Sequence, residues 1–104
     1  MADSDFEREE GVVTESKPRL KKPPLYRVLL HNDDYTSTEF VVFILRTVFQ
    51  RPELDAVRIM LQVHNQGIGV AGVYTYEIAE AKIARVTTLA REQEFPLLCS
   101  LEPD

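Results

Sequence analysis

Hydrophobic residues fall into runs of different period along the chain, and each period predicts a different element. A continuous β-favouring run, Leu-Tyr-Arg-Val-Leu-Leu, predicts a first strand over residues 25–30. A wide apolar face over 37–50 and a one-sided stripe within 53–66 predict two helices. Small and apolar residues then alternate over 68–75, a helical stripe recurs over 76–92, and a last apolar run covers 97–101. The predicted element order is β-α-α-β-α-β.

Short polar residues, Gly and Pro mark the ends of these helices. Thr36, followed three positions later by Glu39, predicts a capping box with Thr36 as the N-cap of the first helix. Pro52 breaks that helix and lies near the first turn of the next, which Gly67 ends as the C′ residue. Thr75 can cap the third helix. The residues expected to face the core are Phe40, Val41, Phe43, Ile44, Leu45, Val48 and Phe49, then Val57, Met60, Leu61 and His64, then Ala79, Ile83, Val86 and Ala90.

This order predicts an α+β fold with three helices on one face of a three-stranded, largely antiparallel sheet. The chain has 104 residues, enough for one small domain. Residues 1–22 carry scattered acids and bases with few large apolar groups, so we expect a flexible N-terminal tail. Pro23-Pro24 closes that tail, and residues 23–104 are expected to form the core domain.

Composition narrows the class of protein. The formal net charge is −5, which argues against a nucleic-acid binder that works by neutralising phosphates. The sequence has no run of 18 apolar residues that would span a membrane, and its acidic N-terminus lacks a secretory h-region. Cys99 is the single cysteine, which fits a reducing cytoplasm. We expect a cytoplasmic protein that binds neither nucleic acid nor membrane.

The candidate chemistry lies in Asn32-Asp33-Asp34, between the first strand and the first helix. A rigid strand and a rigid helix aim the side chains of the turn between them. Both acids cannot be used to cap one helix, so at least one is left for a ligand. Two adjacent carboxylates favour a cationic ligand.

His64 has three interpretations. It is a histidine at the edge of the core, a cation near a helix C-terminus, or a binding residue that joins Asn32 and Asp33 at one site. A zinc site built from Asp33, His64 and His31 is conceivable, but no recognised ligand spacing supports it. His31 is expected at the surface.

Other signals are weaker. Residues 67–72 match G-x-G-x-x-G, but they follow a helix and lie in a strand, the reverse of the dinucleotide-binding context. The acidic pair resembles the magnesium site of two-component receiver domains, yet the chain is too short for the remaining βα units. Cys99 lies in an apolar run and is expected to be a packing group. We see no positioned nucleophile, and an enzyme is the weaker class.

Five segments together resemble ClpS, the adaptor of the bacterial Clp protease. They are Tyr26-Arg-Val-Leu-Leu-His-Asn-Asp-Asp-Tyr-Thr, Glu39-Phe-Val, Met60-Leu-Gln-Val-His-Asn-Gln-Gly, Gly72-Val-Tyr-Thr-Tyr-Glu-Ile-Ala-Glu-Ala-Lys and Pro96-Leu-Leu-Cys-Ser-Leu-Glu. The resemblance covers residues 23–102, and the motifs agree in order and spacing. It implies a non-catalytic adaptor without a cofactor. Such an adaptor binds N-degrons, substrates that begin with Leu, Phe, Tyr or Trp, and delivers them to a Clp AAA+ unfoldase of the ClpA or ClpC type.

Carried over by position, the resemblance assigns three groups of residues. Asn32, Asp33 and His64 would hold the free α-amino group of the substrate. The side-chain pocket would be lined or gated by Thr36, Thr38, Val41, Met60, Val63 and Leu97. Glu77 and Lys82 would face the N-terminal domain of the unfoldase, and the tail would engage it during delivery. The chain gives no sign of self-association, so we expect a monomer.

Thr38 departs from the family pattern. The family commonly has a bulky Met at this position, where it gates the pocket and excludes β-branched residues. The smaller, polar Thr indicates a specialised paralogue with an altered preference, either weaker for Leu or less strict against Ile and Val. Two other functions compete with the adaptor: a generic protein-interaction domain without recognition of an N-terminus, and the receiver-like magnesium site.

Overall fold

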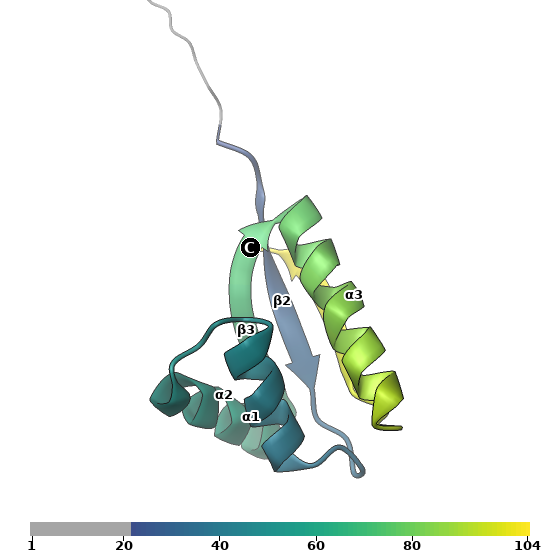
Figure 1. Cartoon of the computed structure of the whole chain (residues 1–104). Coiled ribbons are helices and arrows are strands. Elements are labelled where there is room, and N and C mark those ends of the chain that lie inside the picture. The colour runs from purple at the N-terminus through teal and green to yellow at the C-terminus, as the bar shows by residue number, and fades with distance from the viewer. Residues whose placement is uncertain (1–21) are drawn as a thin grey trace, which may run out of the picture.

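The structure, a computed structural model, describes residues 22–104, and all of the predicted tail over residues 1–22 except its last residue lies outside them. The elements are β2 (Leu25–His31), α1 (Thr38–Thr47), α2 (Glu53–Gln66), β3 (Ile68–Thr75), α3 (Tyr76–Glu92) and β4 (Leu98–Pro103) (Figure 1). The predicted order and fold class are confirmed. In the described part of the chain, no helix is long and apolar enough to cross a membrane.

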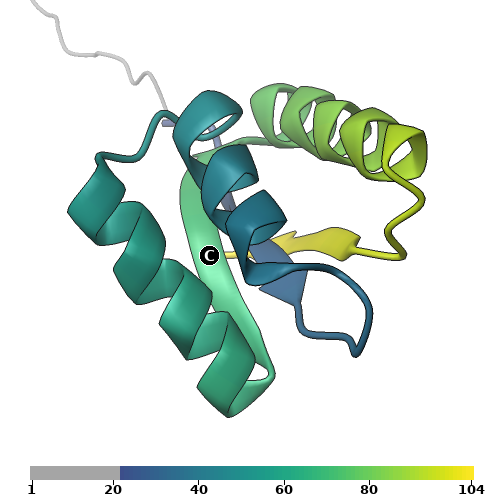
Figure 2. The ribbon, with the colours of Figure 1, turned by 60° about the horizontal axis from the view of Figure 1, so that its bottom comes forward.

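The sheet has the order β3-β2-β4, and β2 pairs antiparallel with both neighbours. Its register shifts between Val28 and Leu29, where β3 carries the extra residue Ala71. The central strand is therefore the first of the three described strands, and the loop that follows it leaves the sheet between its two neighbours. Figure 2 shows this loop running from the end of β2 to the start of α1.

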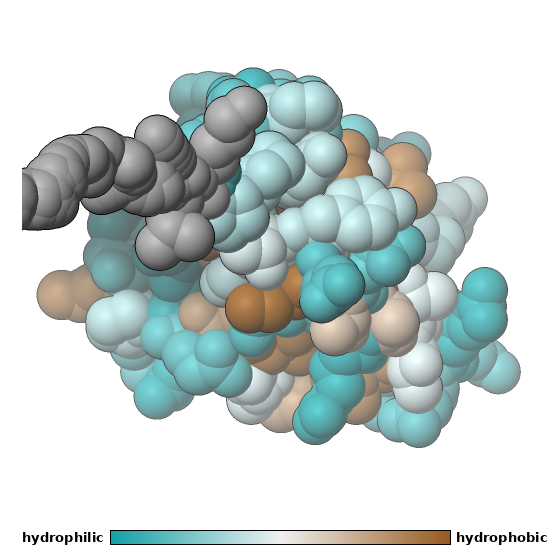
Figure 3. Space-filling model, turned by 90° about the horizontal axis from the view of Figure 1, so that it is seen from above, coloured by the Kyte–Doolittle hydropathy of each residue, from teal (hydrophilic) through white to brown (hydrophobic). Residues whose placement is uncertain are grey.

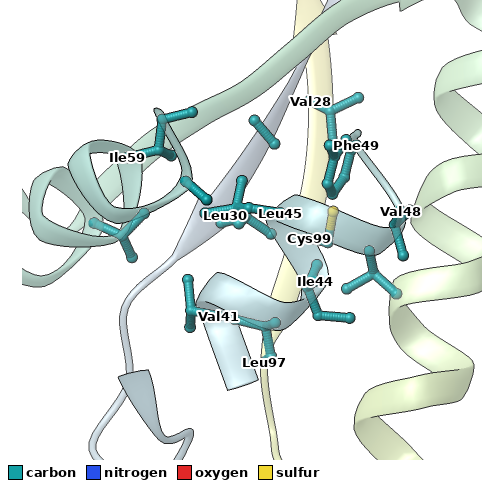
Figure 4. Close-up of a cluster of buried hydrophobic side chains, with 14 of the residues drawn as sticks. Val28, Leu30, Val41, Ile44, Leu45, Val48, Phe49, Ile59, Leu97 and Cys99 are labelled. Carbon is teal, nitrogen blue, oxygen red and sulfur yellow. The ribbon is translucent and has the colours of Figure 1, made fainter. Parts of the chain in front are cut away.

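The two faces of β2 differ in polarity. Val28 and Leu30 are fully buried, and they belong to the core that the helices cover (Figure 4). On the other face, Arg27 forms an ion pair with Glu102 at 2.6 Å. Leu29, on the same face as Arg27, is also buried, but it does not belong to the core cluster that the helices cover, so the helices lie on one face of the sheet, as the sequence predicts. Burial raises the pKa of the Cys99 thiol to about 12, so Cys99 is the packing group that the sequence indicates.

Helix α1 differs from its prediction at both ends. Its N-cap is Ser37, whose hydroxyl accepts a hydrogen bond from the Phe40 N–H at 3.1 Å, and not Thr36. The prediction was wrong because Thr36 donates its N–H and its hydroxyl to the Asp33 carboxylate instead. The helix ends at Thr47, before the predicted Gln50, since Gln50 has a left-handed φ of 51° that cannot continue a helix.

Helix α2 has the predicted bounds, and Gly67 ends it with a left-handed φ of 88°. Its buried stripe is Ala56, Ile59 and Val63, one position away from the predicted one. Leu61 is 47% exposed and His64 is exposed, so this part of the prediction was wrong. The reason is that α2 packs against both β3 and α1. The side of α2 that faces these two elements is not the side that the spacing of apolar residues predicts.

Helix α3 also has its predicted bounds, and Ala79, Val86 and Ala90 are buried. Thr75 is its N-cap residue, although its side chain makes no capping hydrogen bond. The last strand begins one residue later than predicted, so Leu97 precedes it and is buried. Seen from above, the surface carries apolar side chains in small groups between hydrophilic ones (Figure 3).

Candidate functional site

The loop after β2 is tied to the C-terminal end of α2. The Asn32 N–H donates to the Gly67 carbonyl at 2.9 Å, and the Gly67 N–H in turn donates to the Val63 carbonyl at 2.9 Å. His64 lies in the last turn of α2, three positions before Gly67. The two segments that carry Asn32 and His64 are therefore neighbours, although they are distant in the sequence.

Asp33 organises the loop from within. Its Oδ1 accepts hydrogen bonds from the Tyr35 N–H at 2.8 Å and the Thr36 N–H at 2.7 Å, and its Oδ2 accepts one from the Thr36 hydroxyl at 2.8 Å. Partial burial alone raises the pKa of Asp33, but the bonds from the Thr36 N–H, the Tyr35 N–H and the Thr36 hydroxyl outweigh it. They hold the pKa below its ordinary 3.8. Asp33 is therefore a half-buried, stably charged carboxylate, while Asp34 is exposed.

The Asp33 carboxylate still has capacity for a ligand. A carboxylate offers about four lone-pair positions, and the loop occupies three of them. The remaining position is on Oδ2. Asp33 therefore builds the loop and still has one acceptor position free, and Asp34 is exposed, which is compatible with the expectation that at least one of the two acids is left for a ligand.

The two histidines have different surroundings. His64 is exposed at the end of α2, so it is not a histidine at the edge of the core. His31 is half-buried rather than at the surface, and its Nε2 lies 2.8 Å from the Ser100 Oγ in the sheet. Within residues 22–104, no group of three or more His, Cys, Asp or Glu is arranged to hold a metal ion. The zinc and magnesium interpretations therefore gain no support from the described residues.

The predicted side-chain pocket rests on the core. Val41, Val63 and Leu97 are 6%, 3% and 7% exposed and belong to one buried cluster, with Met60 packed partly buried against it. Figure 4 shows Val41 and Leu97 at the same end of this cluster. Thr36 is half-buried by its bond to Asp33, and Thr38, the first residue of α1, is exposed. The six predicted residues thus range from buried apolar side chains to an exposed polar one.

Gly69 permits the close approach of β3 to α2 at Val63. A Cβ at Gly69 would lie 2.7 Å from the Val63 Cγ2, which is shorter than a van der Waals contact allows. The glycine motif of residues 67–72 therefore serves a helix end and a tightly packed strand, as the sequence predicts.

Glu77 and Lys82 lie elsewhere, in a pocket of about 430 Å³ between the C-terminal end of α1 and α3. The Lys82 ammonium donates to the Val48 carbonyl at 2.7 Å and to the Gln50 Oε1 at 3.2 Å. It also lies 5.2 Å from the Tyr74 ring centroid. Val48 and Gln50 could not be predicted as partners of Lys82, because no local pattern marks contacts between residues more than 30 positions apart.

Comparison with known proteins identifies the family. The family described as ATP-dependent Clp protease adaptor protein ClpS matches residues 21–100. The chain is 58% identical over 100 residues to the ATP-dependent Clp protease adapter protein ClpS of Myxococcus xanthus, with 94% of each chain covered. It is 51% identical to the one of Rhodospirillum centenum over 108 residues, covering all of both chains.

A solved structure has the same fold. It is Agrobacterium tumefaciens ClpS2 bound to L-phenylalaninamide, which superposes with a TM-score of 0.76 at 42% identity and covers 80% of this chain and 100% of its own. All these findings point to the same family: the family match over residues 21–100, the two relatives and the solved structure. The chain therefore belongs to the ClpS family of Clp protease adaptors.

Proposed function

We propose that this adaptor binds proteins that begin with Leu, Phe, Tyr or Trp and delivers them to a Clp AAA+ unfoldase. The observation that carries the proposal is the L-phenylalaninamide bound to Agrobacterium ClpS2. That molecule combines a free α-amino group, a large apolar side chain and a neutral amide, as the first residue of a chain does. The present chain offers groups of matching chemistry at one end of the sheet.

The α-amino group is assigned to Asn32, Asp33 and His64. An ammonium has three donors and needs three acceptors in a fixed arrangement. The Asn32 Oδ1, the free position on the Asp33 Oδ2 and a neutral His64 nitrogen are suitable acceptors. The support is that the loop fixes the Asp33 carboxylate by three hydrogen bonds and that a backbone bond joins Asn32 to the end of α2.

The first side chain is assigned to the apolar floor of Val41, Val63 and Leu97, with Met60 beside it and Thr36 and Thr38 at the rim. Burying a Leu or Phe side chain contributes about 1.5–3 kcal/mol. A charge-assisted hydrogen bond contributes about 1.5–3 kcal/mol. Neither part alone gives useful affinity after the costs of association, and together they support micromolar binding, about 8 kcal/mol.

Delivery is assigned to a second surface, the pocket between α1 and α3 that Glu77 and Lys82 line. The partner there would be the N-terminal domain of an unfoldase of the ClpA or ClpC type. The adaptor would act as a monomer, without a cofactor and without catalysis. The adaptor would bind a substrate at the first site while the unfoldase is bound at the second.

A titration by fluorescence anisotropy tests the recognition of an N-terminus. A labelled peptide that begins with Phe is compared with the same peptide acetylated at its N-terminus. We expect acetylation to weaken binding at least about a hundredfold, because it removes the charge and two donors.

The two competing functions give different results in the same assay. Equal affinity for the free and the acetylated peptide would indicate a generic interaction domain and would remove the proposal. Binding that EDTA abolishes would indicate a metal site. A peptide with an internal Phe and a first Ser is the matched control, and it should bind as poorly as the acetylated one.

A further inference from the structure

The C-terminal end of α1 contains an unusual residue. Gln50 has a left-handed φ of 51°, a conformation that favours glycine. Its side-chain amide is bonded at both ends: the Nε2 donates to the Thr47 carbonyl at 3.1 Å, and the Oε1 accepts from Lys82 at 3.2 Å. The side chain at this position therefore has a role that a glycine, better suited to the backbone, would not fill.

The Lys82 ammonium is fixed by these contacts. Besides the Gln50 Oε1 it reaches the Val48 carbonyl at 2.7 Å, and it lies 5.9 Å and 5.2 Å from the ring centroids of Phe49 and Tyr74. Two of the three ammonium donors are thus satisfied within the protein, and one is left. A long, flexible cation is held in one place at the side of a pocket that Glu77, Ile78 and Arg85 also line.

We propose that Gln50 is a positioning residue that pre-orders the Lys82 ammonium for the unfoldase. The inference rests on the proposed function, in which Lys82 faces the unfoldase. A free lysine loses side-chain entropy when a partner orders it, and a lysine that is already ordered does not. The remaining donor of Lys82 is then available to an acceptor group of the partner, in a pocket that the apolar Ile78 also lines.

The variant Gln50→Gly separates this role from a purely structural one. Glycine relieves the left-handed backbone, so we expect the unfolding midpoint to stay the same or rise. The same variant removes the acceptor from Lys82, so we expect the affinity for the isolated N-terminal domain of the unfoldase to fall about fivefold. The affinity for a peptide that begins with Phe should not change.

Glu94→Gly is the matched control. Glu94 has a similar left-handed φ of 60°, but it lies at the end of α3 and is not among the residues that line the pocket. This variant also replaces a residue with a left-handed φ by glycine. It should bind the unfoldase domain and the peptide that begins with Phe as tightly as the wild type does. The NMR signal of the Lys82 ammonium is the second readout, and it should broaden in Gln50→Gly and not in Glu94→Gly.

The outcomes distinguish the inference from the proposed function. If Lys82→Met binds the unfoldase domain as tightly as the wild type, the proposed docking surface is wrong. If Lys82→Met weakens binding and Gln50→Gly does not, the docking surface stands and the role of Gln50 is wrong. If Gln50→Gly is less stable than Glu94→Gly, the variant Gln50→Asn is used in its place. It should likewise lower the affinity for the unfoldase domain about fivefold and leave the affinity for the peptide unchanged. Asn tolerates the left-handed backbone, and its amide is one methylene too short for both bonds.

Discussion

The two ends of helix α1 hold charges of opposite sign, and they do so by different means. At the N-terminal end, the Asp33 carboxylate is fixed by donors from residues two and three positions away. At the C-terminal end, the Lys82 ammonium is fixed by acceptors 32 and 34 positions away. The helix has 10 residues, so about 15 Å separates the two ends.

The difference shows how independent the two proposed sites are. The hydrogen bonds that fix the Asp33 carboxylate all come from Tyr35 and Thr36 within the same loop. The Lys82 site exists only when α3 packs against the end of α1. The carbonyl groups at the C-terminal end of a helix also favour a nearby cation, and this further stabilises the Lys82 ammonium in its position. Changes at one end should therefore leave binding at the other end unaffected.

The largest effect is expected from Asp33→Ala. It removes both the charge that we propose meets the α-amino group and the acceptor that fixes the loop, so the affinity for a peptide that begins with Phe should fall about a hundredfold, or about 3 kcal/mol. Asp34→Ala is the matched control and should stay within about twofold. Anisotropy titrations measure both, and equal losses would show that the loop acts only through its total charge.

Lys82→Met tests the other end. Met keeps the apolar stem and removes the ammonium, so the affinity for the unfoldase domain should fall about tenfold. The free energy of unfolding should fall by about 1.5 kcal/mol, because the charge-assisted bond to the Val48 carbonyl is lost. Calorimetry and denaturant unfolding measure these quantities. A simultaneous loss of peptide affinity would contradict the independence of the two ends.

Thr38→Met should have a smaller, selective effect. Thr38 is exposed at the first position of α1. A Met there would add apolar contact at the rim of the proposed side-chain pocket. We expect a gain of about 1 kcal/mol for peptides that begin with Leu, roughly fivefold, and less for aromatic residues, or a stricter rejection of Ile and Val. A panel of peptides that differ only in residue one measures this. An unchanged ranking would end the idea of an altered preference.

The smallest effect is the acid dependence of stability at the Asp33 end. The pKa of Asp33 is lower in the folded protein than its ordinary 3.8, so the charged carboxylate stabilises the fold above that pH. This contribution is lost as pH falls below 3.8 through the lower folded value. The difference in unfolding midpoint between the wild type and Asp33→Asn should therefore shrink on acidification below pH 4. A difference that grows instead would reverse the sign of the pKa shift.

Most elements could be predicted from the sequence because their signals are local. Helix α2 and helix α3 have the predicted bounds, since Pro52, Gly67 and Thr75 mark their ends directly. The cap of α1 was misplaced by one residue because Thr36 and Ser37 are both capable caps, and only the bond from Thr36 to Asp33 decides between them. The buried side of α2 was misplaced because it depends on two neighbouring elements.

The sequence by itself determined the element order, the family and the acidic turn after the first strand, since each is written in residues that are adjacent or a few positions apart. The tertiary structure alone decided that the end of α2 lies beside Asn32, that Val63 and Leu97 share one buried cluster, and that Lys82 sits on the end of α1. These are contacts between distant residues. Their geometry depends on how the helices pack on the sheet, and no local pattern of residues records it.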